Sequence, residues 1–471
     1  MTSRAFTSPQ DAVRYYKLQD RAGYDLAPLQ YVDLESSVLW DRTKWFYDVG
    51  VGKTVCSTVQ AWMLGHHCHI VLVPPILIAQ WVRWLRRVDS DSVLAYQGTV
   101  KQRKAMPLKG FRWVVMSYGI FREDFDRIFV ELGREHPHII VDEATALKNS
   151  GSILYRRVNA LSAGGPLQLL TGTPTNKPTD AYAYVKLTTP SVYRSYGHFE
   201  SLHVAERDFF GNITAYQHLD VLNQNLMLQA LKRTKDEMFP GIIKPRYDPI
   251  FYDLSAKHKK LYNQLAEEQL LLHTNGDKID ATTQQRLYHA LQQIVVNFDY
   301  FSGDSSARSA VYDLIDNTIE DTECLRPDRS KLIIWTYYKR TSSAILGYLE
   351  DCKAVGAYSG VDSQKSIKEF MENPRCRILV AQPRSAGMGL EPQHVCWENL
   401  FVEHSTLPLD FVQSVGRTDR KGQKHMPTMR IAVAKDTIQV PLHDRLLKNG
   451  DLVQEVEGNL NSIRDAIYGR C

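Results

Sequence analysis

The sequence predicts an α/β fold with two parallel-sheet lobes and helical insertions between them, and three observations support this fold class. Short runs of β-branched and aromatic residues alternate with longer segments of helical spacing, which is typical of parallel α/β architecture. These runs form two series, separated by a segment rich in Leu, Gln, Glu and His. At 471 residues the chain is too long for one hydrophobic core and suits two domains of ordinary size.

The expected elements follow in chain order. The first series of strands covers residues 44–48, 70–73, 113–117, 138–142 and 167–171. Residues 199–233 are predicted to be mostly helical, 247–254 to form one extended strand and 257–298 to be helical again. The second series covers residues 331–336, 354–358, 377–381, 399–403 and 428–433. We therefore expect residues 1–240 to form the first lobe, with a helical insertion at about 195–235, residues 241–304 to form a linker with a helical element, and residues 305–471 to form the second lobe.

Composition and charge exclude several classes of protein. The seven cysteines are scattered without a C-x-x-C pair, which argues against a disulfide framework and a zinc ribbon and fits a reducing compartment. The run 66–69 (His-His-Cys-His) leads into an apolar run and is interpreted as a turn before a strand. The sequence has no signal-peptide pattern and no apolar stretch of membrane-spanning length, so we expect no membrane association. The expected location is the cytoplasm, associated with the nucleoid, or the host cytoplasm for a viral protein.

A mild basic character is compatible with a polyanionic partner. The formal net charge is +4, which alone is too small to demonstrate such a partner. The segment 80–112 is more basic, with eight Lys and Arg side chains against Asp89 and Asp91. It is either a solvated helix face with a basic loop or a surface that tracks phosphates, and its place in the chain favours the second interpretation.

The first candidate site is the loop Gly50-Val51-Gly52-Lys53-Thr54, between an expected strand and an expected helix. Glycines let backbone N–H groups point at phosphates, and the helix N-terminus adds positive potential. Lys53 is expected to reach the terminal phosphates of ATP, and the Thr54 hydroxyl to ligate Mg²⁺. The full pattern G-x-x-x-x-G-K-[ST] is not met, because Tyr47 stands where its first glycine would be.

Two further motifs complete the expected ATPase site. Asp142 and Glu143 end an expected strand, where sites of α/β proteins lie, and we expect Asp142 to hold Mg²⁺ and Glu143 to polarise the attacking water. Arg417 and Arg420 are three residues apart, so that both guanidinium groups could reach the γ-phosphate, with Gln413 one turn earlier. The alternatives are a helix N-terminal turn for the acids and a basic helix end for the arginines.

These motifs together resemble the Swi/Snf, chromatin-remodeller-like branch of helicase superfamily two, in its small stand-alone bacterial or phage form. The resemblance covers residues 30–438 in the right order and departs from the family at Thr145, where a histidine is usual, and at Gly416, which is nearer the general superfamily pattern. The matching segments are Tyr47–Thr54, Pro74–Trp81, Met116–Tyr118, Asp142–Asn149, Leu170–Pro174, Lys232–Lys235, Ser385–Leu390 and Gln413–Gln423.

The resemblance implies two RecA-like lobes that close on ATP, with duplex DNA in a groove across both. Gln30 matches the glutamine that reads adenine, and Gly389 belongs to the second-lobe motif on the nucleotide side. Thr171 and Thr173 match the motif that couples hydrolysis to lobe motion. Further positions match residues that touch or orient the DNA backbone: Pro74, Ser117, Lys148, Arg233 and Ser385. Trp81 and Trp84 are interpreted as packing residues.

The leading hypothesis is an ATP-dependent translocase or remodelling motor on double-stranded or branched DNA, with ATP and Mg²⁺ as cofactors. Its expected setting is the replication fork, recombination or repair, where replication or recombination proteins are expected partners, and we expect a monomer. One alternative is a helicase that separates strands of DNA or RNA, for which the region 202–301 would have to supply a wedge. An alternative from another class is an ATP-gated DNA-binding scaffold with little turnover.

Overall fold

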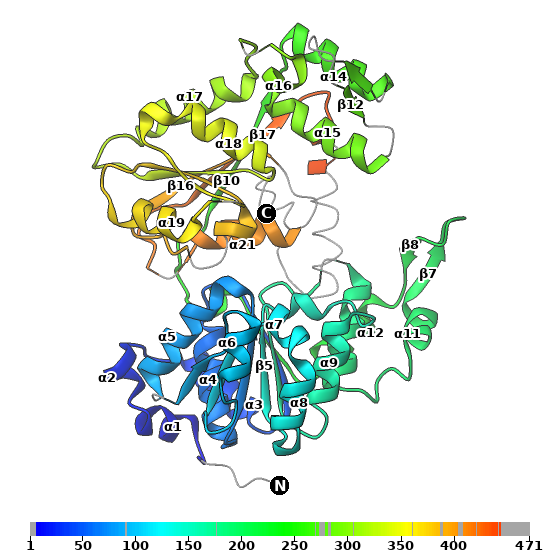
Figure 1. The fold of residues 1–471 in the computed structure, drawn as a ribbon, viewed down its shortest axis with the longest axis vertical. Coiled ribbons are helices and arrows are strands. Elements are labelled where there is room, and N and C mark those ends of the chain that lie inside the picture. The colour runs from blue at the N-terminus through cyan, green and yellow to red at the C-terminus, as the bar shows by residue number, and fades with distance from the viewer. Residues whose placement is uncertain are drawn as a thin grey trace. The chain divides into compact units, whose positions relative to one another are not determined.

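The chain divides into two compact units, with the division between Gly241 and Ile242. The computed structural model describes residues 6–443 except 90–91, 176, 269, 273–277, 281–283, 305, 360, 387–389, 404–407, 421 and 441. Each unit contains one large parallel sheet covered by helices on both faces, so the predicted α/β fold class is confirmed (Figure 1).

The first unit is built on a seven-stranded sheet of order β3-β4-β2-β5-β6-β1-β9, in which all pairs are parallel. Every residue of β2, β4 and β5 is buried, as expected for strands that have helices on both sides. The strands are β1 Arg42–Tyr47, β2 His69–Val73, β3 Val93–Ala95, β4 Trp113–Ser117, β5 His138–Asp142, β6 Leu167–Leu170 and β9 Ala230–Arg233, and a separate hairpin is formed by β7 Val204–Arg207 and β8 Ile213–Tyr216.

The helices of this unit connect the strands and cover the two sheet faces. They are α1 Pro9–Tyr15, α2 Leu18–Ala22, α3 Pro28–Ser37, α4 Lys53–Leu64, α5 Ile78–Val88, α6 Val100–Ala105, α7 Tyr118–Glu123, α8 Phe125–Leu132, α9 Ile153–Leu161, α10 Ala181–Thr188, α11 Tyr196–His203, α12 Leu219–Met227 and α13 Lys235–Met238. Short 3₁₀ helices are η1 Pro75–Leu77, η2 Gly133–Glu135, η3 Ala144–Leu147 and η4 Pro178–Asp180.

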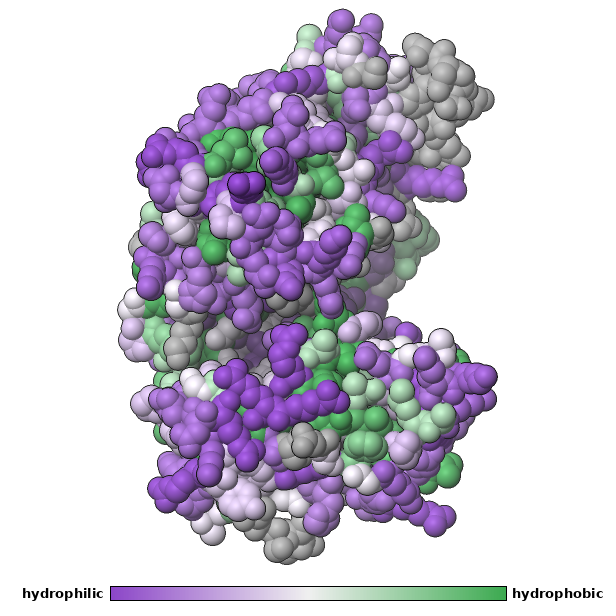
Figure 2. Space-filling view, turned by 60° about the vertical axis from the view of Figure 1, so that its left-hand side comes forward, coloured by the Kyte–Doolittle hydropathy of each residue, from purple (hydrophilic) through white to green (hydrophobic). Residues whose placement is uncertain are grey.

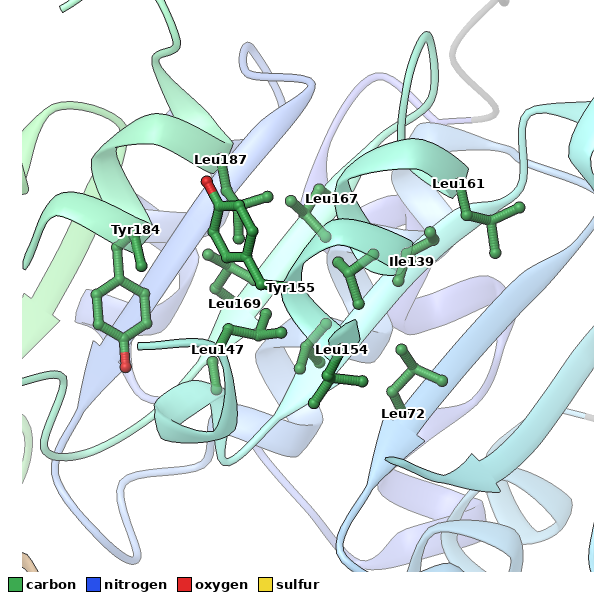
Figure 3. Close-up of a cluster of buried hydrophobic side chains, with 14 of the residues drawn as sticks. Leu72, Ile139, Leu147, Leu154, Tyr155, Leu161, Leu167, Leu169, Tyr184 and Leu187 are labelled. Atoms are coloured by element: carbon green, nitrogen blue, oxygen red, sulfur yellow. The ribbon is translucent and has the colours of Figure 1, made fainter. Parts of the chain in front are cut away.

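One face of the first sheet packs against α9 and α10 in a hydrophobic core. Figure 3 shows leucines and tyrosines of these helices interdigitating with apolar side chains of β2, β5 and β6. Leu167 and Leu169, for example, lie on the same face of β6 because successive strand residues alternate between faces. This packing fixes the strands whose carboxyl ends carry the candidate site.

The second unit contains a six-stranded parallel sheet of order β10-β17-β16-β13-β15-β14. Its strands are β10 Arg246–Tyr252, β13 Lys331–Trp335, β14 Val355–Ala357, β15 Ile378–Ala381, β16 Cys396–Phe401 and β17 Thr428–Ala434, and β11 Leu270–Leu272 with β12 Lys278–Asp280 forms a small hairpin. The helices are α14 Ala256–Glu268, α15 Gln284–Val296, α16 Phe298–Ser302, α17 Ala310–Thr322, α18 Lys339–Tyr348, α19 Ser363–Glu372, α20 Pro383–Ala386 and α21 Pro408–Thr418, with the 3₁₀ helix η5 Glu350–Cys352.

The structure agrees with most predicted elements and corrects two. The predicted strands 113–117 and 138–142 coincide with β4 and β5, and the strand predicted at 247–254 is β10. The segment 199–233 was predicted to be mostly helical. It also contains the β7–β8 hairpin and β9, so the prediction of a mostly helical segment was wrong. The segment 257–298 contains the β11–β12 hairpin between two helices. Both hairpins are short and stand outside the large sheets, so they leave little periodic signal in the sequence. The boundaries at 240 and 304 stay a prediction.

Two histidines at the amino-terminal edge of the first sheet form a buried pair. His69 and His138 are register partners on β2 and β5, their Nδ1 atoms lie 3.1 Å apart, and Trp113 stacks on the His69 ring. Burial lowers the pKa of His138 to about 3 and that of His69 well below 6.5. Both rings are therefore neutral in the folded protein at neutral pH.

This pair predicts acid sensitivity of the first unit. Because the pKa of each folded histidine is depressed, the unfolded chain binds more protons below pH 6.5, and stability falls as pH falls. Between pH 7 and pH 5 His138 is expected to cost about 2 kcal/mol of unfolding free energy, and His69 adds to this loss. Urea unfolding followed by tryptophan fluorescence measures this loss. The variant His69→Phe with His138→Leu lacks both rings, and an unchanged pH dependence in this variant would contradict the assignment.

Candidate nucleotide site

The loop between β1 and α4 has the local structure that binding of phosphates requires. β1 ends at Tyr47 and α4 begins at Lys53, so the loop 48–52 connects a buried strand directly to a helix N-terminus. Gly50 and Gly52 adopt φ values of 85° and 98°, which residues with a Cβ rarely adopt. The loop therefore turns tightly at its glycines, and Thr54 follows in the first turn of the helix.

The Lys53 ammonium group lies over the start of its own loop. It donates hydrogen bonds to the carbonyl oxygens of Tyr47 and Asp48, at 2.7 and 3.1 Å. A Cβ atom on Gly172 would lie 3.3 Å from Lys53 Nζ and 3.2 Å from Tyr47 O. Glycine at this position thus lets the segment after β6 approach the phosphate loop closely.

Asp142 is buried at the carboxyl end of β5, and two donors fix its side chain. Trp81 Nε1 donates to Oδ2 at 2.7 Å, and the backbone N–H of Glu143 donates to Oδ1 at 3.0 Å. Burial raises the pKa of Asp142, while the Trp81 hydrogen bond and the charge of Lys53 act in the opposite direction. Trp81, predicted to be a packing residue, is indeed buried, and its indole N–H also orients the carboxylate.

Glu143 adopts a left-handed backbone conformation that is rare for a non-glycine residue. Its φ is 52°, and such conformations cost about 1–3 kcal/mol and are concentrated at functional sites. The hydroxyl of Tyr118 donates to the carbonyl oxygens of Asp142 and Glu143, and Thr145 Oγ1 donates to the latter oxygen at 3.3 Å. Thr145, which stands in place of the family's histidine, therefore supports the Glu143 turn.

The buried carboxylate of Asp33, which binds the residue before the phosphate loop, was not predicted from the sequence. Asp33, on α3, accepts hydrogen bonds from the Tyr47 hydroxyl at 2.5 Å and from Arg233 Nε and Nη2 at 2.9 and 2.5 Å. Asp48, which follows Tyr47 in the sequence, accepts a hydrogen bond from the backbone N–H of Lys235 at 3.0 Å. Arg233 is thus engaged in a bidentate ion pair within the first unit. Its predicted role as a DNA contact stays a prediction.

Gln30 lies on the same helix as Asp33 and contacts the phosphate loop. Its Oε1 accepts the N–H of Ala27 at 2.8 Å, and its Nε2 donates to Val51 O at 2.8 Å and to the Tyr24 hydroxyl at 3.3 Å. A Cβ on Gly52 would lie 2.6 Å from both Gln30 Nε2 and Tyr24 OH, and the φ of 98° is rarely adopted by residues with a Cβ, so both observations favour glycine here. The structure places Gln30 beside the nucleotide loop, and its role in reading adenine stays a prediction.

The other predicted coupling and DNA-contact residues of the first unit lie near strand ends. Thr171 is buried after β6, and its Oγ1 accepts the backbone N–H of Thr173 at 3.2 Å. Lys148 Nζ lies 4.0 Å from the buried Asp180 carboxylate. Pro74 follows β2, and Ser117 Oγ caps α7. Their assigned functions are not tested by these contacts.

In the second unit the predicted arginines lie on and just after α21. Arg417 is buried in the last turn of α21, and Gln413 is four residues earlier on the same helix. Arg420 follows the helix and pairs with Glu391 at 3.0 Å. Ser385 lies in α20, and Gly389 lies outside the described residues.

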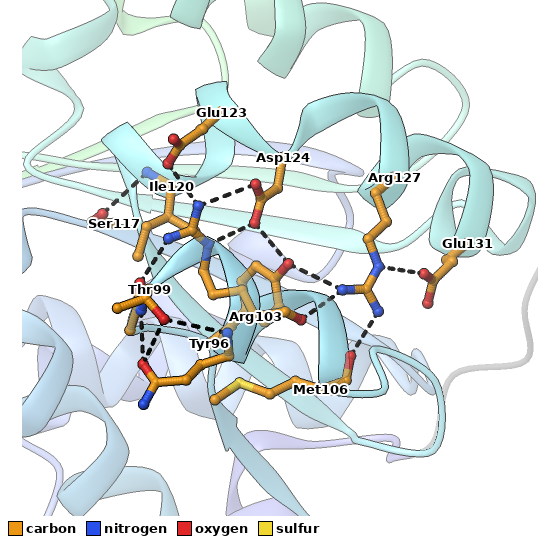
Figure 4. A network of polar contacts seen from close by, with 12 residues as sticks. Tyr96, Thr99, Arg103, Met106, Ser117, Ile120, Glu123, Asp124, Arg127 and Glu131 are labelled. Atoms are coloured by element: carbon orange, nitrogen blue, oxygen red, sulfur yellow. Dashed lines mark hydrogen bonds and ion pairs between the residues drawn. The ribbon is translucent and has the colours of Figure 1, made fainter.

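The basic segment 80–112 contributes less surface charge than its composition suggests. Arg103 is buried and pairs with Glu123 at 2.6 Å and Asp124 at 2.7 Å, in the network shown in Figure 4. Arg112 pairs with Asp89 at 3.1 Å. The assignment of the buried Arg103 to a phosphate-tracking surface was therefore wrong, whereas that of Arg112 stays a prediction. Figure 2 turns the side with α5 toward the viewer, where hydrophilic residues cover much of the first unit. The remaining basic residues are exposed: Arg83, Arg86, Arg87, Lys101, Lys104 and Lys109.

The residues proposed for Mg²⁺ have the right donor chemistry. Mg²⁺ bound with a nucleotide usually takes only one or two protein oxygens in addition to phosphate oxygens and water. Thr54 and Asp142 supply a hydroxyl and a carboxylate, and the buried carboxylate gains from a neighbouring cation. Within the described ranges no group of three or more His, Cys, Asp or Glu side chains could hold a metal by itself. None of the helices in the described part of the chain has the length and apolar character needed to cross a membrane.

Comparison with known proteins finds relatives that match residues of both units. A family model described as the SNF2-related domain matches residues 36–297. A chromodomain-helicase-DNA-binding protein 1-like from Danio rerio is 23% identical over 457 residues, which cover 89% of this chain and 42% of the relative. An uncharacterized ATP-dependent helicase from Mycoplasma genitalium is 21% identical over 396 residues, 79% of this chain and 35% of the relative. The chain thus spans less than half the length of these curated relatives.

A solved structure shows the same fold. The Hef helicase domain of Pyrococcus furiosus superposes with a TM-score of 0.50 at 14% identity, and the match covers 90% of this chain and 98% of that chain. The likeness supports the fold of two α/β lobes.

The hydrogen bond from Trp81 to Asp142 generates a prediction. Trp81→Phe keeps the packing but removes the indole N–H, so the carboxylate is less well oriented toward Mg²⁺. We expect the Mg²⁺ concentration for half-maximal ATP hydrolysis to rise roughly tenfold. Trp84→Phe is the matched control, because that indole N–H donates to Thr58 and not to a carboxylate. Equal Mg²⁺ dependence of the two variants would argue against this role.

Proposed function

Because this chain belongs to the SNF2-related family, a Swi/Snf-type branch of the nucleic-acid-dependent ATPases of helicase superfamily two, we propose that it is an ATP-driven DNA motor. Its track is double-stranded or branched DNA. The observation that best supports this proposal is the convergence of Lys53, Gly172 and Asp142 at the carboxyl edge of the first sheet. The names of the relatives, a helicase-DNA-binding protein and an ATP-dependent helicase, agree with it.

In the proposed mechanism the first unit binds and activates ATP. Lys53 leaves its two loop carbonyls to bind the terminal phosphates, and the N–H groups of the loop and of α4 bind the others. Thr54 and Asp142 would hold Mg²⁺, which would neutralise charge on the phosphates. Glu143 orients the attacking water and accepts its proton.

The second unit stabilises the transferred phosphoryl group. Arg417 and Arg420 bind γ-phosphate oxygens as charge spreads over them, and Arg420 exchanges its ion pair with Glu391 for phosphate. Glu391 is solvent-exposed and is hydrated when Arg420 leaves it, which lowers the cost of this exchange. Gln413, one helical turn before Arg417 on α21, contacts the same phosphate group in this mechanism.

Coupling and DNA contact are assigned to residues near these motifs. Thr171 and Thr173 transmit hydrolysis to the movement of the lobes. Pro74, Ser117 and Lys148 of the first unit and Ser385 of the second contact the DNA backbone. Such contacts read phosphates and not base sequence. We place the motor at branched intermediates of replication, recombination or repair, where it acts as a monomer in the cytoplasm.

The rate of ATP hydrolysis with a panel of ligands tests this function. The panel contains single-stranded DNA, uninterrupted duplex, forked DNA and RNA, each at saturating concentration. A duplex motor is stimulated by duplex and forked DNA and displaces the third strand of a triplex. Stimulation by single strands alone, with strand displacement but no triplex displacement, identifies a helicase. Tight duplex binding with negligible turnover identifies an ATP-gated scaffold.

Substitutions at the two halves of the site test the residue roles. Lys53→Ala and Arg420→Ala are each expected to lower duplex-stimulated ATP hydrolysis by roughly 10³-fold or more, with the fold intact. Arg329→Ala, which removes an exposed arginine that pairs with Glu323, is the matched control for Arg420 and should retain full turnover. Turnover near that of the unmodified protein in either test variant would refute its assignment.

A further inference from the structure

The β7–β8 hairpin of the first unit exposes two adjacent phenylalanines at its tip. Phe209 is 97% exposed and Phe210 is 85% exposed, and the ring centroids lie 5.6 Å apart at an interplanar angle of 84°. Burying one such side chain typically contributes about 1.5–3 kcal/mol. Figure 1 shows the hairpin projecting from the body of the unit beside α11. Two adjacent aromatic rings are thus left exposed to solvent at the tip.

The tip is held in one conformation by its own hydrogen bonds. Asp208 Oδ1 accepts the N–H groups of Phe210 and Asn212 at 3.0 and 2.7 Å, and Asn212 Nδ2 donates to Asp208 Oδ2 at 2.9 Å. Arg207 Nη1 donates to Gly211 O at 2.6 Å. These hydrogen bonds to Asp208 lower the pKa of its carboxyl group. A contact made by the rings therefore costs little ordering of the backbone.

The root of the hairpin is anchored to the segments on either side of α10. The Tyr193 hydroxyl lies 2.8 Å from His203 Nε2, which joins the end of α11 to the segment after α10. At the other strand, burial raises the pKa of Tyr216, and the nearby Asp180 carboxylate adds to this rise. Asp180 is also the residue that faces Lys148, a proposed DNA contact. The hairpin thus starts beside the segment that follows Thr173.

The charges around the tip do not favour contact with phosphates. Glu206 and Asp208 flank it, and Arg207 already pairs with Glu200. An uninterrupted duplex presents mainly phosphates, and contact with them relies on positive charge. A base or base pair exposed at a branch instead presents an aromatic face, and stacking on an aromatic side chain contributes about 1–3 kcal/mol per base. The tip is suited to that face.

We propose that Phe209 and Phe210 stack on bases exposed at a DNA branch point and direct the motor to branched DNA. The inference rests on the proposed function, since it names the DNA structure on which the same motor acts. A continuous duplex stacks its bases on one another and presents backbone to the rings, whereas a branch exposes a base face, so the tip discriminates between the two. A ring that stacks at the branch also opposes re-pairing of the bases beside it.

The experiment compares binding to a fork and to a duplex of equal length, without ATP. The fork carries 2-aminopurine at its junction, so stacking changes its fluorescence. We expect Phe209→Ser with Phe210→Ser to weaken fork binding roughly tenfold or more and to abolish the fluorescence change. Duplex binding and duplex-stimulated ATP hydrolysis should stay within about twofold, because the tip does not touch continuous duplex. The control is Leu39→Ser with Val130→Ser, which removes two other exposed apolar side chains of this unit.

Two further variants separate stacking from general apolar contact. Phe209→Tyr with Phe210→Tyr keeps the aromatic faces and should retain the fork preference, whereas Phe209→Leu with Phe210→Leu should lose it. Retention of the preference in the leucine or serine variant would overturn the proposal, because the fork preference would then not depend on aromatic stacking. Absence of DNA-stimulated hydrolysis in the unmodified protein would instead refute the proposed function, and the ATP-free binding ratio would still test the tip.

Discussion

The buried carboxylate of Asp33 holds together the part of the first unit on which the phosphate loop is built. It binds the Tyr47 hydroxyl at the end of β1 and the Arg233 guanidinium at the end of β9. Removing one partner of a buried ion pair leaves a charge that is costly to bury, so α3, β1 and β9 are constrained together. Gln30, one turn earlier on α3, is thereby fixed under Val51 O. The conformation of the loop therefore depends on this hydrogen-bond network as well as on its glycines.

At the end of β5, too, neighbouring residues hold the side chains of the site in place. Trp81 and the Glu143 N–H orient both oxygens of Asp142, which leaves lone pairs for a cation. The strained backbone of Glu143 persists because Tyr118 and Thr145 bind the neighbouring carbonyl oxygens. A threonine in place of the usual histidine is therefore compatible with the turn that displays Glu143. Position and orientation of the two acids are determined by residues that do not themselves react.

The sequence predicted those features that depend on contiguous residues. The strands at 113–117 and 138–142 were recognised because buried parallel strands are uninterrupted apolar runs. The site motifs combine a strand end with an adjacent loop and are equally local. The pairing of Asp33 with a residue two hundred positions later leaves no local pattern, and neither does the burial of Arg103 among acids of α7 and the following turn. The hairpin within 199–233 was missed because its strands are short and none of their residues is buried.

A short segment connects the nucleotide loop to the hairpin within the first unit. At one end, Gly172 lies close to the Lys53 ammonium group, so a movement of that group changes this contact. At the other end, Asp180 faces Lys148 and lies beside Tyr216 at the hairpin root. Residues of one connection, between β6 and α10, therefore lie beside both the nucleotide loop and the hairpin root.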